Sequence, residues 1–118
     1  MRDAPFVLDF AALSERDRPL VGGKAASLGA LLAAGCPVPP GFALTTAAYR
    51  YFLEANGLTG LFRLDHSVGA NLDEAAAALS RRVEEAFLAA ALPDDLASEL
   101  AASYARLGQL VGSAAPVV

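Results

Sequence analysis

Residues 18–29 read RPLVGGKAASLG, and they mark the place where a charged segment changes into a helical pattern. After Lys24, small and apolar residues recur at helical spacing, which predicts a helix over about residues 24–34. Gly35 follows this run and is placed to end the helix in the left-handed conformation that glycine adopts readily. The stretch therefore predicts that a short helix of small residues starts directly after the pair of glycines.

The segments on either side of this helix predict two short strands. The sequence FVLDF at Phe6–Phe10 alternates apolar and polar residues, as an edge strand does. Between Ala11 and Leu20 we expect a loop or a single turn, because this segment is charged and contains a proline. The CPVPPGF segment that follows Gly35 excludes a helix, so we expect it to run extended into a second strand at Phe42–Leu44.

Capping residues and apolar spacing predict three further helices, over about residues 46–56, about residues 72–91, and from Pro93 to Gly108. In the first of these helices, Thr45 or Thr46 is expected to cap the start and Asn56-Gly57 to close the end. Asn71 is expected to cap the second helix, and Pro93 to lie in the first turn of the third. The expected buried faces are Tyr49, Phe52 and Leu53, then Leu72, Ala76, Leu79, Val83 and Phe87, then Leu96, Leu100, Tyr104 and Leu107. Residues 58–70 are expected to form a short helical piece and a polar loop. Pro116–Val118 are expected to be the start of another strand, with a frayed tail as the alternative. The predicted fold class is therefore α+β, mostly helical with short strands.

Composition and charge limit the classes of function. The 118 residues carry a formal net charge of −4, which argues against a surface for nucleic acid. The apolar runs are shorter than the ~20 residues that span a membrane, no helix is basic and amphipathic, and the N-terminal residues lack the apolar core of a signal peptide. The single cysteine, Cys36, allows no internal disulfide. We therefore expect a cytoplasmic protein with neither nucleic acid nor a membrane as partner.

Gly22, Gly23 and Lys24 form the strongest candidate for a binding site. Two glycines let the backbone approach an anion closely, and a helix N-terminus adds N–H groups and a partial positive charge. Lys24, the only lysine of the chain, adds an ammonium group, so the three residues predict a phosphate contact. The pattern is neither a P-loop nor a dinucleotide-binding fingerprint. The alternative is a tight turn with a solvent-exposed lysine.

The other chemistry-bearing residues predict neither a catalytic group nor a metal site. His66, the only histidine, lies beside Asp65 in a polar loop and is expected on the surface. Cys36 is expected to pack rather than to react. The acidic residues fall on helix faces and first turns, where they suit dipole and ion-pair roles better than a pair of catalytic carboxylates. Arg50 and Arg63 are candidates to reach a ligand, on their charge alone.

A composite pattern spans Leu20–Leu53. It combines Gly-Gly-Lys, the small-residue helix with Leu28-Gly29, and the downstream sequences PVPPGF, Thr-Thr and Ala-Tyr-Arg. This pattern resembles the start of the ATP-binding domain of the phosphoenolpyruvate synthase and pyruvate,phosphate dikinase family, a domain that rifamycin phosphotransferases share. The FVLDF strand also fits, whereas the segment from about residue 58 to residue 112 matches only in its layout of helices.

The resemblance implies an ATP-grasp-type fold in which ATP, with Mg²⁺, phosphorylates a histidine on a separate carrier domain. That histidine passes the phosphoryl group to pyruvate, or in the drug-modifying branch to a rifamycin. The family's Gly-Gly-Lys lysine contacts nucleotide phosphate and matches Lys24. The metal ligands, the carrier histidine and the pyruvate-binding domain are expected outside this chain. We therefore expect residues 1–118 to be an incomplete, N-terminal portion of an ATP-binding domain, without turnover of its own.

A second hypothesis is a stand-alone helical interaction domain that binds no nucleotide. Its support is the alanine-rich helices and the missing catalytic parts. If the chain is a domain fragment instead, its sheet edges lack their partners, and we expect the isolated chain to be marginally stable or to self-associate. A cooperative, concentration-independent melt of a monomer would contradict that expectation.

Overall fold

The chain forms two compact units in the computed structural model, one made of Met1–Tyr49 with Pro93–Val118 and the other of Arg50–Leu92. The structure describes residues 4–62 and 71–112. The boundary between the units falls inside one helix, α2 (Thr46–Ala55).

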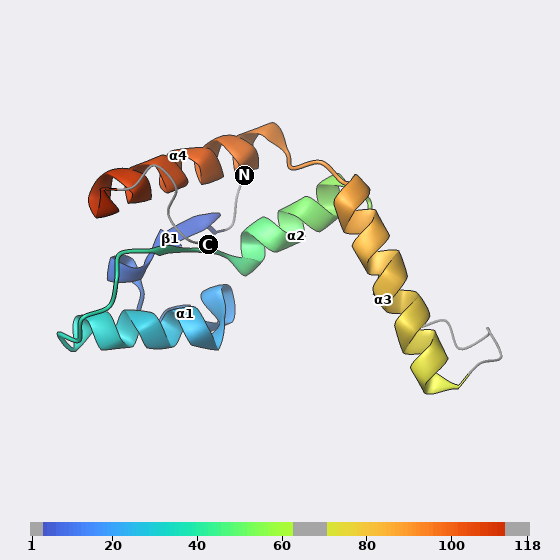
Figure 1. The fold of residues 1–118 in the computed structure, drawn as a ribbon, viewed down its shortest axis with the longest axis horizontal. Coiled ribbons are helices and arrows are strands. Elements are labelled where there is room, and N and C mark those ends of the chain that lie inside the picture. The colour runs from blue at the N-terminus through green and yellow to red at the C-terminus, as the bar shows by residue number, and fades with distance from the viewer. Residues whose placement is uncertain (1–3, 63–70, 113–118) are drawn as a thin grey trace. The chain divides into compact units, whose positions relative to one another are not determined.

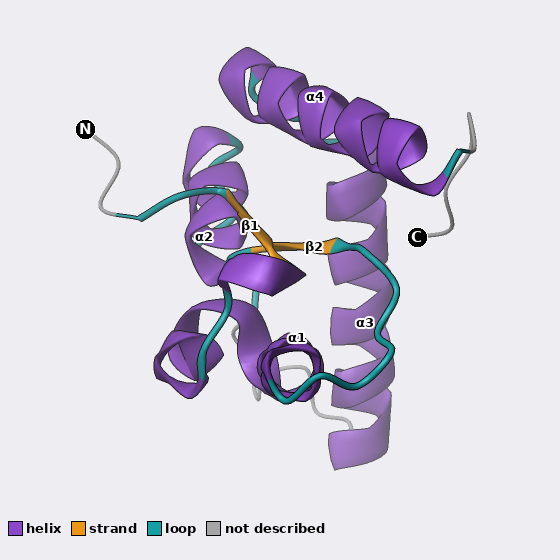
Figure 2. Ribbon diagram, turned by 90° about the vertical axis from the view of Figure 1, so that its left-hand side faces the viewer, coloured by secondary structure: helices purple, strands orange, loops and turns teal. Residues whose placement is uncertain are grey.

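The first unit is built on a pair of short strands. Strand β1 (Val7–Asp9) pairs antiparallel with β2 (Phe42–Leu44), so that Val7 lies opposite Leu44 and Asp9 opposite Phe42. Helices α1 (Arg18–Ala33) and α4 (Asp94–Val111) lie on opposite sides of this pair (Figures 1 and 2). Both predicted strands are confirmed, and the described part of the chain is α+β and mostly helical, as expected.

Helix α1 begins earlier than the sequence predicts. The segment before Lys24, expected as a loop or a single turn, contains two 3-10 turns, η1 (Phe10–Ala12) and η2 (Glu15–Asp17), and then the first turn of α1. A proline in the first turn of this helix suits its start, because the proline ring presets a helical φ angle and that position needs no N–H donor. The helix is interrupted at Gly22, so the predicted helix over about 24–34 corresponds to its second part.

The end of α1 follows the prediction. Gly35 has a φ of 86°, in the left-handed region. Its N–H donates to the Leu32 carbonyl at 3.1 Å, and the Cys36 N–H donates to the Leu31 carbonyl at 3.0 Å. This pair of bonds is the Schellman arrangement, which satisfies the last carbonyls of a helix. Gly35 therefore ends the helix as expected.

Small residues let α1 approach the segment that precedes it. Ala25, Ala26 and Gly29 are the buried residues of α1. A Cβ on Gly29 would lie 2.6 Å from the Leu13 Cβ, closer than real side chains approach. Leu13 is itself buried. The small residues after Lys24 thus allow the helix to pack closely against the chain around η1.

Thr45, rather than Thr46, caps α2. Its Oγ1 accepts a hydrogen bond from the Ala48 N–H at 3.2 Å, the arrangement of an N-cap. The same hydroxyl donates to the Pro5 carbonyl at 2.7 Å, and the Thr45 N–H donates to the Phe6 carbonyl at 3.0 Å. The residue is 2% exposed. Thr45 therefore joins the start of α2 to the two residues that precede β1.

Helix α4 continues past the glycine that was expected to stop it. Gly108 lies inside the helix, and the prediction of its end there is wrong. The left-handed residue is Gly112, with a φ of 67°. A glycine inside a helix costs only about 1 kcal/mol relative to alanine, so Gly108 does not by itself end one. Leu96 is buried as expected, while the second buried residue of α4, Ser103, was not predicted.

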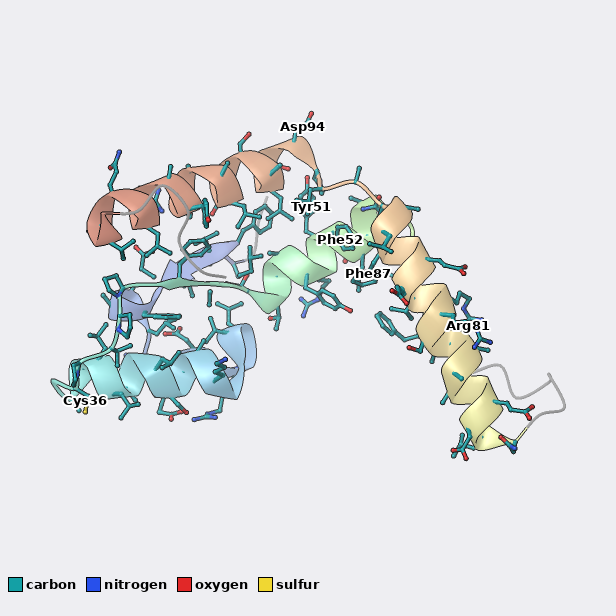
Figure 3. All side chains as sticks on the ribbon, viewed as in Figure 1. Cys36, Tyr51, Phe52, Arg81, Phe87 and Asp94 are labelled. Carbon is teal, nitrogen blue, oxygen red and sulfur yellow. The ribbon has the colours of Figure 1, made fainter. Side chains whose placement is uncertain are left out.

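The second unit contains the later part of α2 and all of α3 (Leu72–Ala89). Asn71 caps α3 as predicted, because its side-chain oxygen accepts the Glu74 N–H at 2.9 Å. The rings of Phe52 and Phe87 meet edge to face with centroids 5.2 Å apart, and Figure 3 shows them turned toward each other. An aromatic pair in this geometry holds α2 and α3 together.

Asn56 makes a second contact within this unit. Its Nδ2 donates to the Phe52 and Ala91 carbonyls, each at 2.9 Å, and its Oδ1 accepts the Ala91 N–H at 3.2 Å. The side chain therefore joins the end of α2 to the segment after α3. The next residue, Gly57, has a φ of 66° and ends α2 as predicted.

Some predicted core positions are exposed. Tyr49 is 46% exposed and Leu72 is 65% exposed, and Ala76 is exposed as well. None of the residues of α3 is fully buried. These predictions are wrong because a periodic apolar face states which side of a helix can be buried, whereas actual burial depends on what packs against it.

Several predicted features lie outside the described residues. They are the loop with His66, the possible ligand contact at Arg63, and the strand at Pro116–Val118. The short helical piece expected after residue 58 is a turn in its described part, residues 59–62. Among the helices of residues 4–62 and 71–112, none combines the length and the apolar character that a membrane crossing requires.

Candidate functional site: the Gly-Gly-Lys turn

The glycine pair occupies the interruption of α1. Gly22 has a φ of 82° and a ψ of 171°, a conformation that only glycine adopts without strain. A Cβ at this position would meet no atom within 4 Å, so the backbone conformation and not a lack of space calls for glycine. The sequence predicts a special turn here, and the structure has one.

A second helical segment starts directly after Gly22. The first N–H groups of a helix have no carbonyl partner within it, and they carry the partial positive charge of the helix N-terminus. Gly22, Gly23 and Lys24 are all exposed, so this start and the lysine side chain face solvent. The local arrangement is suited to an anion, as the sequence predicts, although exposure alone is equally compatible with a simple turn.

An ion pair lies beside this turn. Arg18 Nε donates to Glu15 Oε2 at 2.9 Å, and Arg18 Nη2 donates to Glu15 Oε1 at 2.6 Å. The hydrogen bonds from Arg18 lower the pKa of the Glu15 carboxyl below its ordinary value, and the same bonds raise the pKa of the Arg18 guanidinium. Both side chains are exposed, at 48% for Arg18 and 61% for Glu15, so the pair is a surface pair of small energetic weight.

Arg18 is the residue of this region that the sequence analysis missed. Its Nη1 lies 2.9 Å from the point where a Cβ on Gly23 would be, so the guanidinium rests against the glycine backbone. A glutamate three residues before an arginine is a spacing that brings the two charges together on one turn. This spacing was the available signal, but the segment was expected to be a loop.

A cavity of about 520 Å³ lies in the same unit but at the other end of α1. Its walls include Phe10, Leu32 and Phe42, together with residues of α4 such as Arg106. Leu32 and Gly22 are ten residues apart along α1, which corresponds to about 15 Å of helix. The cavity is therefore separate from the Gly-Gly-Lys turn.

The remaining candidate residues form no second site. Cys36 is exposed, so the expectation that it packs is wrong, and Figure 3 shows it at the far end of α1. Arg50 is exposed on α2, in the second unit. Within residues 4–62 and 71–112, no three His, Cys, Asp or Glu side chains gather as a metal site would require.

Comparison with known proteins finds a family model that matches residues 18–118. The model describes the AMP/ATP-binding domain of pyruvate phosphate dikinase. The matched region begins at Arg18 and includes the Gly-Gly-Lys turn, α1 and all the later elements. The turn therefore lies inside a domain whose description names nucleotide binding.

Among curated proteins, the chain is similar to phosphoenolpyruvate synthases and probable phosphoenolpyruvate synthases. It is 38% identical to that of Aeropyrum pernix over 102 residues, which cover 85% of this chain and 12% of the relative. It is 31% identical to a probable phosphoenolpyruvate synthase of Staphylothermus marinus over 94% of this chain and 13% of the relative. Over 49 residues, 42% of this chain and 6% of the relative, it is 57% identical to that of Pyrococcus furiosus. The chain thus spans about an eighth of the length of the first two relatives.

Proposed function

Because the chain belongs to the family of the pyruvate phosphate dikinase AMP/ATP-binding domain, we propose that it is the ATP-binding part of a phosphoenolpyruvate synthase-like phosphotransferase. In this proposal Gly22, Gly23 and Lys24 contact the phosphates of ATP. The observation that carries the proposal is the interruption of α1 at Gly22, which starts a helix at an exposed lysine inside the matched region.

The proposed roles follow from the chemistry of the turn. Gly22 and Gly23 leave the backbone open, so N–H groups at the helix start can donate to phosphate oxygens. The Lys24 ammonium offsets negative charge on the phosphates, which is the main task of a protein in phosphoryl transfer. No catalytic residue is proposed within the described part of the chain. The ligands of Mg²⁺ are proposed to lie outside this chain.

For the whole protein, we propose further domains beside the ATP-binding one. The domain has an ATP-grasp-type fold, and the protein works in the cytoplasm as a kinase. ATP phosphorylates a histidine on a separate carrier domain, and that histidine transfers the phosphoryl group to pyruvate on a further domain. The similarity to phosphoenolpyruvate synthases favours pyruvate as the acceptor. A rifamycin remains the alternative acceptor, because the acceptor binds elsewhere in the protein.

The test is ATP binding by the full-length protein, measured by calorimetry, for wild type and Lys24→Ala. We expect wild type to bind ATP and Lys24→Ala to bind it about tenfold or more weakly, because one charge-assisted contact is lost. Arg81→Ala is the matched control: it also removes an exposed cation, but from α3 in the other unit. Equal affinity for Lys24→Ala and wild type removes Lys24 from the site.

Absence of ATP binding by the full-length protein favours the second hypothesis, a helical interaction domain. Activity provides an independent check. The 118 residues on their own should show no ATP-dependent phosphoryl transfer, because the proposal places the carrier histidine and the acceptor site outside them. Measurable phosphoryl transfer by the purified 118-residue chain would contradict the placement of the carrier histidine and the acceptor site outside it.

A further inference from the structure

Arg18 reaches the Gly-Gly-Lys turn from outside the motif. Its Nη1 lies 2.9 Å from the position of a Cβ on Gly23, so a side chain at position 23 would displace the guanidinium. Gly23 directly precedes Lys24 and opens the second segment of α1. The structure thus brings a second cation to the same backbone that carries the proposed phosphate contacts.

Glu15 holds this cation in place. The two hydrogen bonds of the pair use Nε and Nη2 of Arg18, at 2.9 and 2.6 Å. This bidentate geometry orients the planar guanidinium, and the nitrogen outside the pair, Nη1, is the one against Gly23. Because the Arg18 side chain is 48% exposed, a solute can reach it.

The Arg18 guanidinium lies where a helix start already carries positive charge, a place that favours anionic groups. A helix N-terminus carries a partial positive charge, and a guanidinium beside it adds a like charge. The Glu15 carboxylate offsets that charge, and phosphate oxygens are acceptors of the same kind. Guanidinium groups bind carboxylate and phosphate through the same pairs of N–H donors.

We propose that Arg18, positioned by Glu15, is a second phosphate-contacting residue beside Lys24, with Nη1 as the donor to an ATP phosphate oxygen. This inference rests on the proposed function, because it takes the Gly-Gly-Lys turn as the phosphate site. Gly22 has a backbone conformation that favours glycine, whereas a side chain at position 23 would meet the Arg18 guanidinium and make it shift.

The test compares ATP with adenosine, which lacks phosphates, in calorimetric titrations of the full-length protein. Arg18→Gln should weaken ATP binding about tenfold, the loss of one charge-assisted contact, and leave adenosine binding unchanged. Arg16→Gln is the matched control, since it removes an equal, exposed charge two residues away in η2. It should change ATP affinity by less than about twofold, because an exposed charge without contact is screened.

Gly23→Ala probes the contact itself. The added methyl group should displace the Arg18 guanidinium and weaken ATP binding in wild type, but cause less further loss in Arg18→Gln. This non-additivity is the signature of two positions that act through one contact. Losses that simply add in the double variant overturn the proposal.

The outcomes separate this inference from the proposed function. If Lys24→Ala loses ATP affinity and Arg18→Gln does not, Arg18 has no phosphate contact and the proposed function stands. If Arg18→Gln weakens ATP and adenosine equally, the residue acts on folding, and the inference is refuted. If wild type binds no ATP, the proposed function fails, and the inference fails with it.

Discussion

The packing of α1 gives the sharpest prediction for stability, at Gly29. Replacing Gly29 with alanine adds one methyl group at a point 2.6 Å from the Leu13 Cβ, 3.3 Å from the Leu13 carbonyl oxygen and 3.4 Å from the Phe10 carbonyl oxygen. Carbon atoms in contact normally lie about 3.5–4.0 Å apart, so the two segments must separate by about 1 Å. None of these atoms is the end of a flexible side chain, so the backbone around η1 has to move.

Two effects of opposite sign decide the magnitude. Alanine is favoured over glycine inside a helix by about 1 kcal/mol. Overpacking of a close contact costs about 1–3 kcal/mol, and the upper part of that range applies because the neighbours cannot rotate away. We therefore expect Gly29→Ala to lower the free energy of unfolding by about 1–2 kcal/mol, a net loss although the helix itself gains.

The assay is urea unfolding of the purified protein followed by circular dichroism, with the free energy taken from the midpoint and slope. Ser27→Ala is the matched control, because it makes the same helix more favourable at an exposed position. It should leave stability unchanged or raise it by about 0.5 kcal/mol. A Gly29→Ala protein as stable as wild type would refute the claim that α1 packs directly on η1 and Leu13.

Two further predictions concern hydrogen bonds. Asn56→Asp removes the Nδ2 donor to two carbonyls, including that of Ala91, and should lower the free energy of unfolding by about 2 kcal/mol, as measured by thermal melting. An unchanged melting temperature would show that the contact with Ala91 is not made. The pKa of Glu15 is lowered by the hydrogen bonds from Arg18, so the pair stabilises the fold above the ordinary value of 4.5 and the effect disappears as pH falls through the lower, folded-state pKa. Acid titration of stability should therefore show a difference between wild type and Glu15→Gln that shrinks as the pH falls below the ordinary carboxyl pKa of 4.5, whereas a constant difference would contradict the pairing.

Local signals in the sequence were sufficient for most element ends. Gly35 and Gly57 end their helices in the left-handed conformation, and Asn71 and Thr45 cap theirs through side-chain oxygens. These predictions succeed because a cap depends on the chemistry of a few neighbouring residues. The prediction at Gly108 failed for a related reason: a glycine near a helix end is only a weak signal, since the helix can continue through it at modest cost.

Burial depended on contacts between segments that are distant in the sequence. The periodic face of α3 was read correctly as apolar, yet its first residue, Leu72, is 65% exposed. Ser103 was not recognised as buried, because a serine in a helix carries no pattern that reports what packs on it. Burial is a property of two surfaces, and the periodicity of one helix describes only one of them.

The candidate site shows the same division. By itself, the sequence determined that a glycine pair and a lone lysine stand at a helix start, because backbone freedom and helix polarity are local properties. Only the tertiary structure decided that the two glycines have different tasks. Gly22 has a positive φ with an extended ψ, whereas the absence of a side chain on Gly23 leaves room for Arg18, which a bidentate pair with Glu15 holds in place. The contact at Gly23 depends on how the side chain of a residue five positions earlier is placed, and the glycine pair itself does not specify that placement.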